Sequence, residues 1–458
     1  MTSLSLAPSP LKPVSTTASG GPLGTTAKSS SPPPDRTKAR ASRALKYQAL
    51  SHAAHILRKR ARRLDPSAYP GDRYRTCDCR HHRHSDVEVM RSLEHGSAFY
   101  AGLVTCGSVW ACPVCASRIQ ERRRLEIEHA IDWAKAEGLT PVLVTFTFPH
   151  HKWNSLRDLI SQQREAFKIL RRGRAWMKVK PAGGLIRSLE VTHGEANGWH
   201  PHTHELWFCD PANIPDHPTL VPLWESACRR SGLLSYRPDD PRTGYLYASF
   251  LCNSIVIQDT DRAVSDYLAK QDDDANTWGP SHEIAKATSK EGRAKGVHPH
   301  RFLTRKAPGD EALFLEYVDA MKGARQLFWS PGLKARCGLL DQTDEQLAEE
   351  SRDNADCLAH LTDDQWQVVR GNDARAELLD AAESGGLPAV RALLASLGAP
   401  VPSVGYPSAP DGLGRACGAG EDARARIPAP YARPGPPGRE GDHLGTRTTG
   451  GPTSSDPG

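Results

Sequence analysis

The segment GWHPHTHELWF (198–208) places histidines at every second position, His200, His202 and His204. Residues two apart on a β-strand share a face, so His202 and His204 can bind one ion together. Glu190 lies in the preceding apolar segment, whose flanking Leu and Val point the other way, so we expect it to face away from the core. If the two segments pair as an antiparallel hairpin, two imidazoles and a carboxylate converge. Such a set suits a divalent ion and leaves positions open for phosphate oxygens.

One residue of this segment is expected to lie outside the strand. His200 has the parity of the other two histidines, but Pro201 cannot donate a backbone hydrogen bond. We therefore expect the strand to start at Pro201.

A second set of residues suits zinc. Cys112 and Cys115 form a CxxC pair with Cys106 just before it, and Cys77 and Cys79 lie about thirty residues upstream. A CxxC turn presents two thiolates to one ion, which predicts a structural zinc site. A redox CxxC would need a thioredoxin-like context that is not evident here. The reserve ligands are three nearby histidines, His81, His82 and His84.

A third pair of residues suits nucleophilic chemistry. Tyr267 and Lys270, in SDYLAKQ, are spaced i and i+3 on a predicted helix. A neighbouring ammonium favours the phenolate and can neutralise charge on a phosphate. A tyrosine and a lysine at this spacing are more often ordinary helix surface, so the pair gains weight only from its place after the histidine strand.

Charge is distributed unevenly along the chain. Residues 36–63 hold ten Lys and Arg and no acid, whereas residues 341–383 hold thirteen acids and three arginines. The basic run, together with Arg122, Arg123 and Arg124, predicts contact with a polyanion such as DNA, although a solvated charged helix is the alternative. The sequence shows no signal peptide or membrane span, so we expect a cytoplasmic protein without membrane partners.

The elements around these residues change along the chain. The alternation in TPVLVTFTF (140–148) predicts a strand, and further strands are expected at 184–192, 202–208 and within SFLCNSIVIQ. Helices are expected near 154–175, 218–232 and 313–323, and residues 344–396 should be mostly helical. Two capping boxes support that last region, Thr343 with Gln346 and Thr362 with Gln365.

Taken in order, VTFTF, HPHTH and YLAK, preceded by CGSVWACPVC and followed by RQLFWSPGL, resemble the rolling-circle plasmid replication initiators of the HUH endonuclease superfamily. The similarity is greatest to the single-tyrosine type from high-GC bacteria and covers about residues 72–335. It implies an α+β fold in which an antiparallel β-sheet HUH endonuclease domain with flanking helices is preceded by a zinc knuckle and followed by a helical appendage. The expected organisation is a disordered tail over 1–35, a basic helix and linker over 36–71, a zinc knuckle and helix over 72–138, the endonuclease domain over 139–335, an acidic helical region over 336–398 and a disordered tail over 399–458.

The resemblance also implies roles for individual residues. His202, His204 and, as third ligand, Glu190 would bind a divalent metal, Mn or Mg, that polarises the scissile phosphate. Tyr267 would attack the phosphorus and stay linked to the 5′ phosphate, while Lys270 stabilises charge and the freed 3′ hydroxyl primes replication. The implied partner is plasmid origin DNA, single-stranded at the nick. Three roles stay open for the acidic region 341–396: a site for the host helicase or polymerase, a packed appendage or a dimerisation element.

Two positions depart from the family pattern. The middle residue of the histidine motif is usually apolar but is Thr203 here, on the opposite face from the ligands. Some relatives carry a glutamate one turn before the tyrosine to activate water for termination, where this chain has Ala263. Three aspartates could substitute, Asp259, Asp261 and Asp266.

Three alternatives stay open. A zinc-stabilised DNA-binding regulator would bind DNA without cleaving it. A transposase or relaxase would share the chemistry, although the order of the motifs favours an initiator. A histidine-triad nucleotide hydrolase would use a histidine as nucleophile and would not need Tyr267.

Overall fold

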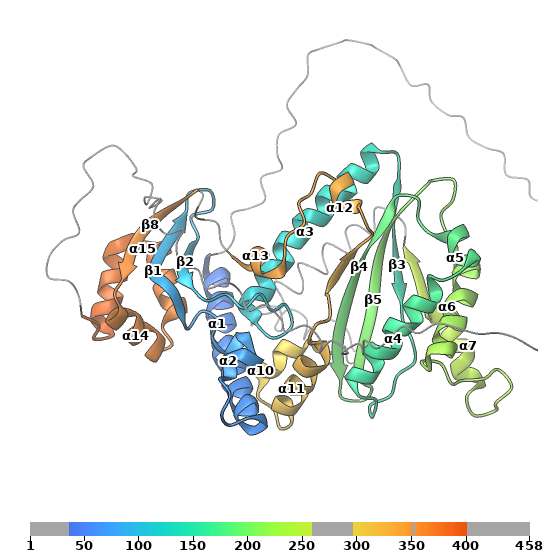
Figure 1. Cartoon of the computed structure of the whole chain (residues 1–458), viewed down its shortest axis with the longest axis horizontal. Helices are drawn as coiled ribbons and strands as arrows, with labels where there is room; N and C mark the ends of the chain where they lie inside the picture. Colours follow the sequence, from blue (N-terminus) through green and yellow to red (C-terminus); the bar gives the residue numbers. More distant parts are fainter. Residues whose placement is uncertain (1–35, 259–295, 350–351, 353, 401–458) are drawn as a thin grey trace, which may run out of the picture. The chain divides into compact units, whose positions relative to one another are not determined.

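In the computed structural model, residues 36–258, 296–349, 352 and 354–400 are described (Figure 1). The chain divides into two compact units, 1–403 and 404–458, and every described residue lies in the first. The expected tails, 1–35 and most of 399–458, therefore fall outside the described residues. Among the described helices, none is both long and apolar enough to cross a bilayer.

The larger sheet is antiparallel and five-stranded, in the order β6-β3-β5-β4-β7. Its hairpin β4–β5 closes through Gly198, whose φ is +71° and where a Cβ would come within 2.6 Å of the Lys152 backbone. Glycine is therefore required at this turn. The strands are β3 (Thr140–Phe146), β4 (Gly184–Gly194), β5 (Gly198–Cys209), β6 (Ile255–Gln258) and β7 (Leu327–Trp329).

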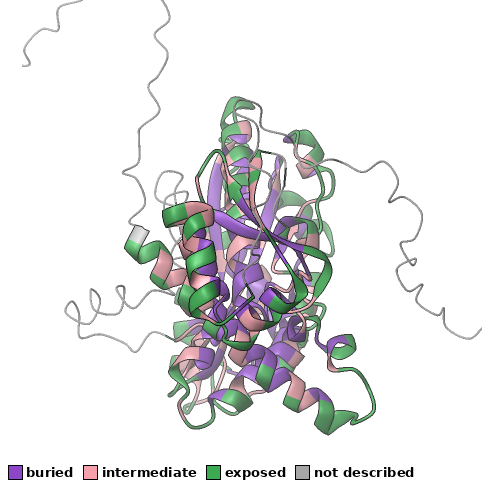
Figure 2. Cartoon of the chain, turned by 90° about the vertical axis from the view of Figure 1, so that its left-hand side faces the viewer, coloured by how far each residue is buried: buried purple, intermediate pink, exposed green. Residues whose placement is uncertain are grey.

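Helices cover both faces of this sheet. On one face, Ile127 and Ile131 of α3 (Pro113–Ala136) pack against Leu206 and Phe208. On the other face, Phe146 contacts Phe167 of α4 (Leu156–Leu170) and Trp224 of α6 (His217–Ser231). Figure 2 shows the buried residues concentrated along the strands. Alternate strand residues thus face either α3 or α4 and α6.

A second sheet, also antiparallel, has the order β2-β1-β8. Its strands are β1 (Arg83–Ser92), β2 (Ala98–Leu103) and β8 (Ala355–Leu361). This sheet was not predicted, since β1 and β2 lie in the expected zinc region and β8 in the expected helical region. Two regions predicted as separate therefore share one sheet, because β8 pairs with β1 across about 265 residues of chain.

The remaining helices mostly follow the expected positions. Residues Phe250–Asn253 of SFLCNSIVIQ, predicted as strand, belong instead to α7, and only Ile255–Gln258 pair with β3. Both predicted capping boxes are present. The elements are α1 (Arg36–Leu64), α2 (Pro70–Arg73), η1 (Arg75–Cys77), α5 (Arg174–Val179), α7 (Gly244–Asn253), η2 (Pro299–Arg301), α10 (Phe302–Arg305), α11 (Asp310–Met321), α12 (Leu333–Arg336), α13 (Asp344–Ala348), α14 (Asp363–Gly371) and α15 (Arg375–Ser396).

The basic run 36–63 forms α1, but this helix is not simply a solvated surface element. Eight of its apolar residues are buried, Leu50 and Leu57 among them. Arg43 pairs with Asp380 and Glu383 of α15. The basic run is therefore partly neutralised by the acidic region rather than wholly available to an external polyanion.

Candidate metal centre

The histidine strand and Glu190 come together as neighbours in the sheet. In the antiparallel register of β4 and β5, Glu190 lies opposite His202. Glu190 Oε2 lies 3.0 Å from His202 Nε2 and 3.3 Å from His204 Nε2. Three potential ligand atoms of these residues lie within 4.8 Å of one another, as a shared ion requires.

The side chains of Glu190, His202 and His204 point to the face of the sheet that α3 covers. Leu206 and Phe208 of β5 point to the same face. Because both faces are covered, Glu190 retains only 20% of its side-chain exposure, although it was expected to face away from the core. Burial raises the pKa of Glu190, but hydrogen bonds from His202 and His204 outweigh that effect and hold the pKa well below its usual range. The carboxylate is thus ionised and suited to a cation.

The orientation of His204 is set by β3. Thr145 Oγ1 lies 2.8 Å from His204 Nδ1, because Thr145 is opposite His204 in the register of β3 and β5. This contact directs Nε2 toward Glu190, as an outer partner does for a metal-binding histidine. The alternation in residues 140–148 predicts the strand but indicates no role for Thr145.

The strand β5 begins earlier than expected. It starts at Gly198, and Pro201 lies inside it, opposite Val191. The proline is tolerated because β3 pairs with β5 only from Thr203 onward, which leaves one edge of β5 unpaired at Pro201. His200 is therefore a strand residue, with its ring centroid 5.1 Å from that of His202.

More histidines lie near this centre than the sequence analysis identified. The ring of His150 lies 4.6 Å from that of His200, measured between centroids. His298 is part-buried, and desolvation lowers its pKa to about 4, opposed by the charge of Glu190. The tripeptide HPH occurs at residues 200–202 and again at 298–300. This repeat was a sequence signal for the additional histidines.

The proposed nucleophile cannot be placed. Tyr267 and Lys270 lie outside the described residues, as do Ala263 and the three aspartates near it. Their roles remain predictions.

A cluster of four cysteines matches the predicted zinc site. Cys79, Cys106, Cys112 and Cys115 are buried with their sulfurs within 4.8 Å of one another. The Sγ atom of Cys79 lies 3.5 Å from that of Cys115 and 3.6 Å from that of Cys112. Tetrahedral zinc with Zn–S bonds of about 2.3 Å requires sulfurs about 3.8 Å apart. The spacing therefore fits zinc and exceeds that of a disulfide.

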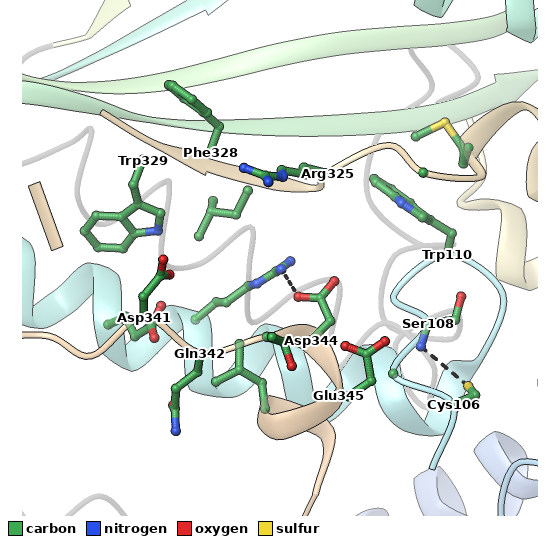
Figure 3. Close-up of a pocket in the computed structure, with 18 of the residues that line it drawn as sticks. Cys106, Ser108, Trp110, Arg325, Phe328, Trp329, Asp341, Gln342, Asp344 and Glu345 are labelled. Carbon is green, nitrogen blue, oxygen red and sulfur yellow. Dashed lines mark hydrogen bonds and ion pairs between the residues drawn. The ribbon is translucent and has the colours of Figure 1, made fainter. Parts of the chain in front are cut away.

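The surroundings of the cluster also suit a cation. Burial raises the pKa of the Cys106 and Cys112 thiols well above their ordinary value, whereas hydrogen bonds from the other cysteines hold the pKa of Cys115 well below it. Several thiolates together would therefore require a compensating positive charge. The backbone N–H of Ser108 donates to the Cys106 sulfur (Figure 3). The backbone N–H of Cys115 donates to the Cys112 sulfur. Cys77 is buried but is not part of the cluster, and the reserve histidines are not part of it either.

A third group of metal-ligand types lies on the smaller sheet, where Glu88, Cys357 and His360 approach one another. Arg352 lies 3.0 Å from the Glu88 carboxylate. A cation thus already neutralises this group, and we assign no metal to it.

The predicted DNA-binding arginines follow the zinc cluster on α3. Arg123 is buried and pairs with Asp344, while Arg124 pairs with Glu121 and Glu128. Arg122 contacts the backbone oxygen of Gln346 at 3.4 Å. Intramolecular partners thus account for Arg123 and Arg124, and DNA contact by the three remains a prediction.

Two cavities lie beside the five-stranded sheet. The larger, of about 980 Å³, runs from Cys106 and Trp110 past β7 to Asp344 (Figure 3). The smaller, of about 550 Å³, lies on the α4 face. Neither is lined by His202, His204 or Glu190, so the candidate metal centre is not at the bottom of either.

Comparison with known proteins gives three matches. Residues 101–229 match a family model described as a replication protein. The chain is 27% identical over 373 residues to a Streptomyces lividans protein named Protein rep, in an alignment that covers 64% of this chain and 78% of that protein. It is 33% identical over 138 residues to a Streptomyces cyanogenus protein named Neomycin resistance protein, covering 24% of this chain and 32% of that protein. No solved structure matches.

Proposed function

We propose that the chain initiates plasmid replication by nicking one strand of the origin DNA, a proposal supported by the match of residues 101–229 to the replication protein family model. The resemblance to plasmid replication proteins is confirmed at the family level. The cleavage chemistry rests on the residues of this chain.

One observation carries this proposal, namely the convergence of His202, His204 and Glu190 on one face of an antiparallel sheet. Two imidazoles and an ionised carboxylate would hold a divalent ion with positions left for phosphate oxygens. A bound Mn²⁺ or Mg²⁺ would act there as a Lewis acid on the scissile phosphate. Thr145 would keep His204 Nε2 directed at the ion by accepting a hydrogen bond from Nδ1–H.

Tyr267 is our candidate nucleophile. Its oxygen would form the bond to phosphorus while the bond to the 3′ oxygen breaks, giving a 5′ phosphotyrosine and a 3′ hydroxyl that takes up the proton. Lys270, three residues on, would stabilise the negative charge that develops. The covalent link conserves the phosphodiester energy, so strand rejoining needs no nucleotide cofactor.

The test is adduct formation by the purified full-length chain. An end-labelled library of single-stranded oligonucleotides with Mn²⁺ or Mg²⁺ should give SDS-resistant protein–DNA adducts, and Tyr267→Phe should give none. His204→Ala should lower the yield about a thousandfold, because a Lewis acid contributes several kcal/mol and about 1.4 kcal/mol is tenfold. Tyr245→Phe, at an exposed tyrosine of α7, is the matched control and should leave adducts unchanged.

Other outcomes favour other functions. Cleavage that persists in Tyr267→Phe would place the nucleophile elsewhere. Specific DNA binding without cleavage would favour a zinc-stabilised regulator.

A further inference from the structure

The smaller cavity lies on the sheet face opposite the candidate metal centre. Thr203 lines it, and Thr203 stands between His202 and His204 on β5 with the opposite orientation. Its volume of about 550 Å³ falls within the usual range for small-molecule sites and can hold one nucleotide unit. The metal centre does not account for this cavity.

Cations dominate the lining of this cavity. The basic side chains are Arg164, Lys168, Arg171, Arg187 and Arg325, and none of its lining residues is acidic. The first three are spaced i, i+4 and i+7 along α4, which places them on one helix face. Glu205 is fully buried and does not line the cavity. It pairs with Arg171 and accepts a hydrogen bond from Trp207 Nε1. Lys168 pairs with Glu165 at 3.1 Å, so two carboxylates partly neutralise a lining that holds five cations.

Aromatic rings hold one of these cations in place. The Arg187 guanidinium lies 5.2 Å from the ring centroid of Phe167 and 4.8 Å from that of Phe328. Burial, followed by the charge of Arg171, lowers the pKa of Arg187 to about 10. Arg171 Nη1 is buried and has no hydrogen-bond partner among the described residues. Fixed guanidinium donors in a positive, part-buried cavity favour an anion.

We propose that this cavity binds a backbone phosphate of a single DNA strand, an inference that rests on the proposed nicking function. Guanidinium forks match two phosphate oxygens at once, and Arg164 and Lys168 at the exposed rim would add phosphate contacts. The apolar part of the lining, with Phe167 and Phe328, suits the sugar and base of the same nucleotide.

The larger cavity indicates a route for the strand. Arg325 and Phe328 line both cavities, next to or within the edge strand β7. Figure 3 shows both residues at the larger cavity. β7 pairs with β4 only, so within the described sheet its outer edge has no strand beside it. A strand bound in the smaller cavity would thus continue around β7 past Arg325.

The experiment measures binding without cleavage. Full-length Tyr267→Phe protein, with its zinc retained and no Mn²⁺ or Mg²⁺ added, is titrated against a labelled single-stranded oligonucleotide, with fluorescence anisotropy as the readout. Arg164→Gln and Arg187→Gln should each weaken binding roughly tenfold and lower the slope of log K against log salt by about one per lost phosphate contact. Arg172→Gln is the matched control, since Arg172 is an exposed residue next to α4 that does not line the cavity. Arg164 is exposed, so its variant should fold even if Arg187→Gln does not.

Each result decides one point. Equal binding by Arg164→Gln and Arg172→Gln would overturn the cavity proposal. If micromolar nucleoside triphosphate displaces the oligonucleotide, the ligand of the cavity is a free nucleotide and not a DNA strand. If polyglutamate at matched ionic strength displaces it equally well, the ligand is an acidic peptide. Failure of the nicking function would appear separately, as loss of adducts with Arg164-dependent binding retained.

Discussion

At the scale of single residues, the candidate metal centre depends on a side chain that no motif includes. Thr145 contacts His204 Nδ1 at 2.8 Å from the neighbouring strand. The Nδ1 atom of His202 instead lies 3.4 Å from the backbone oxygen of His200, a longer contact. The stronger constraint therefore acts on His204, the more buried of the two, with 4% side-chain exposure.

Thr145→Val should weaken metal binding without removing a ligand. Because partners of this kind contribute about 10- to 100-fold to metal affinity, the metal concentration for half-maximal cleavage should rise by that factor. Cleavage at saturating metal should largely recover. Thr147→Val is the control. Thr147 lies two residues after Thr145, but its hydroxyl donates a hydrogen bond to the backbone oxygen of Asn253. An equal loss in both variants would argue against a positioning role.

At the scale of elements, the zinc cluster joins the residues before β1 to the start of α3. Cys79 lies just after η1, and Cys112 and Cys115 lie at the N-terminus of α3. The cluster therefore fixes where α3 starts, and α3 in turn covers the sheet face that carries His202 and His204.

Cys79→Ser should release the metal, whereas Cys77→Ser should retain it. Both thiols are buried, but only Cys79 belongs to the cluster. Metal analysis should give one zinc per chain for the parent and for Cys77→Ser, and none for Cys79→Ser, which should also unfold at a lower temperature because zinc binding stabilises the folded state. Zinc loss in Cys77→Ser alone would reassign the ligand.

The capping box of α14 allows a second test at this scale. Thr362 Oγ1 accepts from the Gln365 N–H, and Gln365 Oε1 accepts from the Thr362 N–H at 3.0 Å. Thr362→Ala should lower the free energy of unfolding by about 1 kcal/mol in urea titrations. Thr362→Ser keeps the hydroxyl and should lose much less, so equal losses would mean that the cap contributes little.

At the scale of the whole molecule, acidic side chains of other elements partly neutralise the basic run 36–63. Arg43 pairs with α15, and Lys59 and Arg60 lie near Glu311 and Asp319 of α11. The pattern was taken to indicate a polyanion partner, yet part of it is satisfied inside the fold. The exposed Arg62 and Arg63 remain available to DNA.

The buried histidines should make stability depend on pH. Burial holds the pKa of His300 well below its ordinary value, and its Nε2 bonds to the Trp110 backbone oxygen. Between that lowered pKa and about 6.5, the unfolded chain binds more protons than the native one, so stability is lost as pH falls. Each such histidine contributes a slope of up to about 1.4 kcal/mol per pH unit.

His300→Gln should remove that contribution. Urea unfolding at pH steps between about 5 and 6.5 should show a shallower dependence by up to about 1.4 kcal/mol per unit. His55→Gln, at an exposed position of α1, controls for the substitution itself. An unchanged slope in His300→Gln would mean that His300 is not neutral in the native chain.

Local patterns were sufficient for much of the centre. The period of two in VTFTF and HPHTH, the CxxC turn and the two capping boxes each depend on residues close in sequence, so the strand faces and helix starts could be predicted. The motif order indicated the replication protein family.

Contacts between distant segments decided the rest. Three features depend on residues far apart in sequence. They are the pairing of β8 with β1, the contact of Cys79 rather than Cys77 with the other cluster cysteines, and the position of Thr145 opposite His204. The placement of Arg187 between Phe167 and Phe328 depends on such residues too. The sequence alone determined which side chains share a face of each element. Only the tertiary structure decided which faces meet, because strand register and packing depend on long-range contacts that local periodicity does not encode.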